Sequence, residues 1–150
     1  MIVNFKFSSG QQVNDTVGGL NGVIDQSTIL DTGNIQYSIL PKSPDGKKRE
    51  ESWYIDEQSL EITEGKIAIL KKHTFKFDTG VKVRDKVTLF EGFITRAMLD
   101  HNKCVRYFLT GLFNYEKNEP NTHCVDEKYL ELVDAPKIKT EKDDTGCVST

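Results

Sequence analysis

The sequence contains the same pattern twice, at a constant offset, for example 75 − 5 = 70. The first copy has the matched residues Phe5, Gly10, Val13, Asp15, Val17, Gly22, Ile24, Tyr37, Asp56, Glu57, Leu60 and Glu61. In the same order, they recur in the second copy as Phe75, Gly80, Val83, Asp85, Val87, Gly92, Ile94, Tyr107, Asp126, Glu127, Leu130 and Glu131. Because one offset fits both ends of the unit without a gap, it predicts one small fold duplicated in tandem. The chain then divides into a first repeat (1–64), a linker (65–74), a second repeat (75–133) and a tail (134–150).

Each repeat is small for an independent domain. A unit of about 60 residues buries only about 60% of the surface that its unfolded chain exposes. The two repeats therefore gain stability by packing on each other, and we expect a shared interface. The sequence leaves open whether the repeats pair within one chain or across a homo-oligomer.

The local patterns predict short antiparallel strands. Apolar residues alternate with polar ones, as in Val81 to Val87, and Gly, Asp and Asn clusters separate these stretches. A sheet bent on itself buries one face and protects its edges. We expect an all-β fold of two tandem SH3-like antiparallel β-barrels with a disordered C-terminal tail. In the first repeat the strands are expected at Ile2–Phe7, Gln11–Val17, Gly22–Ser27, Ile35–Leu40, Ser52–Ile55 and Leu60–Thr63, with copies seventy residues later.

Several repeated polar and glycine positions are typical of turns. Gly22 and Gly92 mark a bulge or a close approach of backbones. Asp15 and Asp85 are expected to cap backbone amides in a turn. The Asp-Glu pairs that begin at 56 and 126 predict a short helical turn before the last strand.

Composition narrows the function classes. A formal net charge of −3 disfavours a dedicated nucleic-acid binder. No apolar run approaches the roughly 20 residues of a membrane helix, and no secretory signal is evident, so we expect a cytoplasmic protein. The odd cysteine count, Cys104, Cys124 and Cys147, argues against structural disulfides. No cofactor signature is present, and we expect no enzymatic activity.

The segment from Phe77 to Thr95, followed by Cys104, Tyr107 and the stretch from Asp126 to Glu131, resembles a group of small bacteriophage proteins of unassigned activity. Their pattern is F-x-x-G-x-x-V-x-D-x-V-T-G-F-x-G-I-x-T, typically in one copy, and Leu89 stands here where that pattern has glycine. The resemblance implies a phage origin, expression in the host cytoplasm, and an accessory or counter-defence role. Because these proteins have no assigned activity, the resemblance implies no catalytic residue in this sequence.

Positions that differ between the copies are the candidates for function. The first copy has Lys42, a basic run that includes Lys47 and Arg49, and then Trp53 and Tyr54. A basic loop beside aromatic rings can hold a phosphate and stack a base. The alternative is a solvated loop with Trp53 in the core.

The second copy carries a further group of cations around one tyrosine. Arginines that alternate with apolar residues on a strand share one face, where they can grip a phosphate or carboxylate. Two histidine–cysteine neighbourhoods lack C-x-x-C spacing, and we expect no metal site. Cys104 is expected to be a small buried hydrophobe. The candidates are Arg96, His101, Lys103, Arg106, Tyr107 and His123.

These observations favour a non-catalytic binding protein. The first hypothesis is a counter-defence protein that sequesters a small anionic, nucleotide-like ligand in a groove between barrels or protomers, with Lys47, Arg49, Trp53, Arg96 and Arg106 as contacts. A protein-binding adaptor that engages a host protein is the alternative. A nucleic-acid binder of the SH3-like kind is third.

Overall fold

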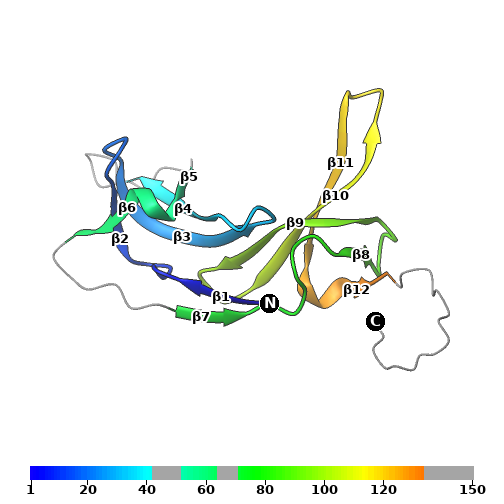
Figure 1. The fold of residues 1–150 in the computed structure, drawn as a ribbon, viewed down its shortest axis with the longest axis horizontal. Coiled ribbons are helices and arrows are strands. Elements are labelled where there is room, and N and C mark those ends of the chain that lie inside the picture. Colours follow the sequence, from blue (N-terminus) through cyan, green and yellow to red (C-terminus); the bar gives the residue numbers. More distant parts are fainter. Residues whose placement is uncertain (42–51, 64–70, 134–150) are drawn as a thin grey trace.

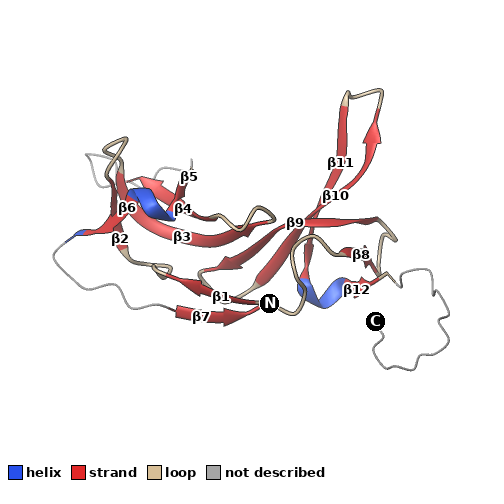
Figure 2. Ribbon diagram, in the orientation of Figure 1, coloured by secondary structure: helices blue, strands red, loops and turns tan. Residues whose placement is uncertain are grey.

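The computed structural model describes residues 1–41, 52–63 and 71–133, and within them the protein is all-β (Figures 1 and 2). Two 3-10 turns, η1 (Glu57–Ser59) and η3 (Glu127–Tyr129), precede the last strand of each repeat, which confirms the expected helical turns. The strands are β1 (Ile2–Phe5), β2 (Gln12–Asp15), β3 (Asn21–Leu30), β4 (Ile35–Pro41), β5 (Trp53–Asp56), β6 (Leu60–Ile62), β7 (Lys71–Thr74), β8 (Lys82–Asp85), β9 (Glu91–Asp100), β10 (Val105–Asn114), β11 (Glu119–Asp126) and β12 (Leu130–Leu132).

All strand pairs are antiparallel, and they form a two-stranded ribbon (β1–β7) and one ten-stranded sheet. Among the described residues, these pairings close neither repeat into a barrel. The reason is that β3 and β9 each run for ten residues and pair with each other, so each repeat covers an edge of its neighbour. The expected shared interface is confirmed, and the predicted disordered tail lies outside the described residues.

The two repeats are related by a pseudo-two-fold axis. At the centre of the β3–β9 pairing, Thr28 lies opposite Met98, its own counterpart seventy positions later. In the ribbon, Val3 likewise lies opposite His73. Strands from the two copies therefore meet at equivalent positions, as subunits do in a self-complementary dimer.

Aromatic side chains from both repeats form one continuous core at this axis. Phe5 and its counterpart Phe75 contact each other edge to face, with ring centroids 6.2 Å apart. Each also contacts the buried tyrosine of its own repeat, Tyr37 or Tyr107. The repeats thus share a core as well as a sheet.

The turn residues behave as their patterns predict. A Cβ on Gly22 would lie 2.4 Å from the Leu40 carbonyl oxygen, and one on Gly92 would lie 2.8 Å from that of Thr110, so both positions require glycine. Oδ1 of Asp85 accepts a hydrogen bond from the Val87 amide at 2.8 Å, and Asp15 does the same in the first repeat. These devices belong to the scaffold.

Candidate functional site

Lys42, Lys47 and Arg49, from the basic loop of the first copy, lie outside the described residues. Trp53 and Tyr54, which follow that loop, begin β5. Trp53 is 53% exposed, so the alternative that it belongs to the core is wrong.

Tyr54, Arg96 and Arg106 are brought together on the sheet face opposite the aromatic core. The Arg96 guanidinium lies over the rings of Tyr54 and Phe108, at 5.5 and 5.7 Å from their centroids. A nitrogen of Arg106 lies 2.7 Å from Oδ2 of Asp100, so its charge is already compensated. We call this group the outer-face cluster.

Tyr107 and His123 lie elsewhere. Tyr107 is fully buried, donates its hydroxyl to Glu127 and accepts the Phe77 amide at 3.2 Å, an arrangement that Tyr37, Glu57 and Phe7 repeat in the first copy. His123 lies 3.1 Å from Asp85 and packs on Phe90. Both side chains are engaged in holding the fold.

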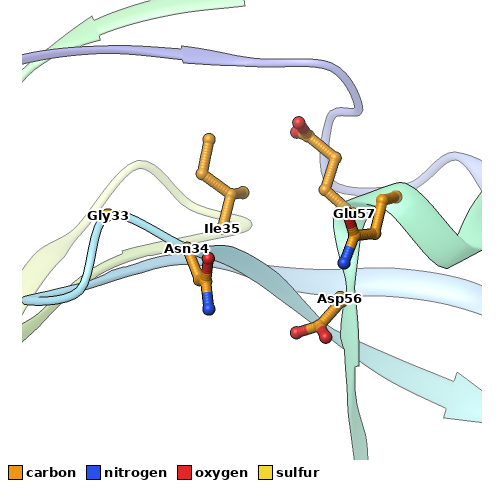
Figure 3. Close-up of a pocket in the computed structure, with 6 residues that line it drawn as sticks. Gly33, Asn34, Ile35, Asp56 and Glu57 are labelled. Carbon is orange, nitrogen blue, oxygen red and sulfur yellow. The ribbon is translucent and has the colours of Figure 1, made fainter.

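Two pockets, of about 170 and 270 Å³, are copies of each other and also belong to the scaffold. In the first repeat, Ile35 and Glu57 extend to one side of the pocket and Asn34 and Asp56 to the other (Figure 3). The second repeat repeats this pocket at the equivalent positions, where Cys104 is exposed instead of buried as predicted. A pocket present in both copies reflects what the fold requires.

A third pocket of about 250 Å³ lies between the repeats, where the β1–β7 ribbon meets the β3–β9 pairing. We call it the inter-repeat groove. Buried phenylalanines and Leu99 give it an apolar side, while three lysines and two histidines supply the polar side. Its lining residues are Phe5, Phe7, Ser8, Ser9, Ser27, Lys71, Lys72, His73, Leu99, Asp100, His101 and Lys103.

The acidic groups near the groove are engaged. The Asp100 carboxylate accepts hydrogen bonds from Gln26 and Arg106, both at 2.7 Å, on the outer face. Asp25 lies 3.3 Å from Nδ1 of His101. Glu127, whose charge acts on His73, accepts hydrogen bonds from the Tyr107 hydroxyl and the Lys76 amide. The three lysines of the groove therefore outnumber the acidic groups that line it.

Two buried polar atoms of groove residues, Oγ of Ser8 and Nε2 of His73, have no hydrogen-bond partner among the described residues. An unsatisfied buried polar atom costs about 1–3 kcal/mol, so each requires an explanation. Burial holds the pKa of His73 below its ordinary value, and the charge of Lys103 lowers it further against the opposing effect of Glu127.

The equivalent position across the pseudo-two-fold axis has a different chemistry. Lys71 and His73 correspond to Met1 and Val3. Met1 packs against the core, and its nitrogen lies 3.1 Å from Asp78, which corresponds to Ser8. One side of the axis therefore has an apolar residue and an ammonium–carboxylate pair, and the other has, among the described residues, unpaired cations and unsatisfied polar atoms.

The two sides of the pseudo-two-fold axis also differ in the residue that occupies a left-handed backbone conformation. Gly33 has a φ of +91° in the β3–β4 turn, a conformation that glycine adopts without strain. Its counterpart Lys103 has a φ of +68°. A lysine therefore occupies a left-handed position beside the groove, as Leu89 and Asn118 do elsewhere in the described residues.

Comparison of the chain with protein-family models, with curated proteins and with solved structures gave no match. No helix in the described part of the chain is long and apolar enough to cross a membrane. Within the same residues, no group of three or more His, Cys, Asp or Glu side chains is placed to hold a metal ion.

The sequence pattern indicates His101 and Lys103 among the second-copy cations, but not Lys71, His73 and Ser8. The available signal was the repeat itself, because Lys71 and His73 replace Met1 and Val3 at the same offset. The sequence predicts a linker strand or short helix over residues 65–72, and its last two residues, Lys71 and Lys72, begin the strand β7.

Proposed function

We propose that this protein is a non-catalytic binding protein that holds a small anionic ligand in the inter-repeat groove. The observation that carries the proposal is the asymmetry between the groove and its pseudo-symmetric counterpart. Within a duplicated fold, a position that the scaffold strictly requires keeps its residue in both copies, and Lys71, His73 and Lys103 do not. Cations and unsatisfied polar atoms gathered on one side only are therefore best explained by a ligand.

The chemistry of the lining favours a phosphate group. Lysine ammonium groups bind phosphate oxygens as point charges, and a serine hydroxyl and an imidazole add directional donors. The groove, at about 250 Å³, is smaller than the roughly 300–1,000 Å³ typical of drug-sized ligands. We therefore favour the phosphate-bearing end of a nucleotide-like molecule, with its organic part extending past Leu99.

The outer-face cluster supports this proposal less well than the groove does. Arg106 is paired with Asp100 through its Nη2 atom, although its Nε is buried without a partner among the described residues, and Arg96 lies over two rings. We therefore propose that Lys71, His73 and Lys103 contact the ligand, in place of Arg96 and Arg106.

The test is calorimetric titration with pyrophosphate and adenosine monophosphate. Lys71→Met installs the counterpart residue and should weaken binding at least tenfold, because a charge-assisted contact is worth about 1.5–3 kcal/mol. Lys117→Met makes the same charge change at the exposed β10–β11 turn and should leave the affinity unchanged. Equal affinities for all three proteins would refute the groove as the site.

Two finer expectations form part of the same proposal. In the first repeat, the final strand β6 returns to pair with β2, as a small SH3-like barrel requires, which supports an SH3-like origin for each repeat. The resemblance to phage proteins supports a counter-defence role in the host cytoplasm, in which the anion would be a host signal.

The protein-binding alternative has one observation in its favour. The β10–β11 hairpin projects from the body of the molecule, and Leu112 on it is 85% exposed (Figure 1). An adaptor would bind a host protein through this hairpin and lose that partner in a Leu112→Lys variant, while pyrophosphate would have no effect. Salt-insensitive capture of that partner would also exclude a nucleic-acid binder.

A further inference from the structure

We propose that the groove takes up a proton with its anion, and that His73 is the residue that accepts it. This inference rests on the proposed anion binding and adds its regulation: the protein would bind more tightly as the pH falls. The step involves a proton alone, taken from solvent and held on the imidazole.

The placement of His73 supports this role. Its ring packs edge to face on Phe75, with centroids 4.6 Å apart, and it lies opposite Val3 in the ribbon. Its Nε2 is buried without a partner among the described residues. A neutral imidazole has one donor and one acceptor nitrogen, whereas the protonated ring has two donors, the form that an anion stabilises.

The charges around His73 come from three elements. Lys71 shares the ribbon face with His73, because alternate residues of a strand point to the same side. Lys103, in the β9–β10 turn, opposes protonation, and Glu127 of η3 favours it. Asp100 and His101 also line the groove, and each has a partner described above.

An anion would reverse the balance that keeps the ring neutral. In the empty groove, burial and Lys103 hold the pKa of His73 below its ordinary value. A bound dianion supplies negative charge in the groove and neutralises Lys103, so the pKa of His73 rises. Between the two pKa values the affinity then increases as the pH falls, by up to roughly tenfold per pH unit for one proton.

The other two histidines of the chain are engaged differently. His101 pairs with Asp25, and His123 pairs with Asp85. His123 therefore serves as an internal reference that lies outside the groove, while His101 tests whether a second groove histidine contributes.

The experiment is a proton NMR titration of the three histidine rings from pH 5 to 8.5, with and without saturating sulfate. Sulfate stays a dianion over this range, so any change in proton uptake belongs to the protein. We expect sulfate to raise the pKa of His73 and to leave the ring resonances of His123 unmoved. In parallel, His73→Gln should bind sulfate with a much weaker pH dependence, while His123→Gln should retain the slope of the parent protein.

The outcomes separate the two proposals. If sulfate shifts groove resonances saturably but the His73 titration does not move, the proton linkage is wrong and anion binding stands. If His101→Gln abolishes the slope and His73→Gln retains it, the linkage is assigned to the wrong residue. If no groove resonance responds to sulfate, pyrophosphate or adenosine monophosphate, both proposals fail.

Discussion

Replacing Lys103 with glycine should stabilise the protein and at the same time weaken its anion binding. Lys103 has a φ of +68°, and a left-handed conformation costs an L-residue roughly 1–2 kcal/mol. Its side chain is exposed, so little packing is lost. Because glycine also has a more flexible unfolded state, we expect a net gain of about 1 kcal/mol, or roughly 2–4 °C in Tm.

Leu89 provides the matched control. It has a φ of +65° and is 67% exposed, and its counterpart is Gly19. Leu89→Gly should therefore relieve similar strain without touching the groove.

Urea unfolding should show increased stability in both variants, while calorimetry with pyrophosphate should show at least tenfold weaker binding in Lys103→Gly only. Loss of stability in Lys103→Gly would refute the strain argument. Unchanged affinity would refute the role of Lys103 in the groove.

Three further predictions test the scaffold and the groove. Gly22→Ala should destabilise the protein by more than about 2 kcal/mol in urea unfolding, because the new Cβ would lie 2.4 Å from a backbone oxygen; a loss below 0.5 kcal/mol, roughly the effect of a surface change, would contradict the close approach. Burial opposes the charge of Asp85, but hydrogen bonds from Val87, Thr88 and His123 outweigh it and lower the pKa of this carboxyl. The charged carboxylate therefore stabilises the fold above the ordinary aspartate pKa, and this stabilisation is lost as the pH falls through the pKa of the folded state. Asp85→Asn should make the free energy of unfolding, measured in urea between about pH 2 and 6, depend less on pH. Ser8→Ala should raise the stability by about 1 kcal/mol, since it removes a buried hydroxyl without a partner, and a loss of stability would show that the hydroxyl is satisfied.

Much of the fold follows from local rules that the sequence displays. Alternation located the strands, and glycine and aspartate located the turns, because these signals depend only on neighbouring residues. The constant offset indicated two equivalent units. It did not indicate that β3 and β9 continue to Leu30 and Asp100 and pair across the axis, since strand partners are decided by burial of the whole surface.

The site was harder to predict for the same reason. Arg96 and Arg106 stand out because arginine is conspicuous on a strand, yet the structure gives Arg106 a carboxylate partner. His73 and Lys71 become informative only when the pseudo-two-fold axis places them opposite Val3 and Phe5 and beside the β9–β10 turn. Comparison of the two repeats residue by residue would have found these differences, but not their convergence.

The central claim is that one side of the pseudo-two-fold axis binds an anion and the other does not. Its most direct test is an amide NMR titration with pyrophosphate, in which each groove residue has a built-in reference in the other repeat. We expect saturable shifts at Ser8 and Lys103, with their counterparts Asp78 and Gly33 unmoved. Equal shifts on both sides, or shifts confined to the outer-face cluster, would contradict the account.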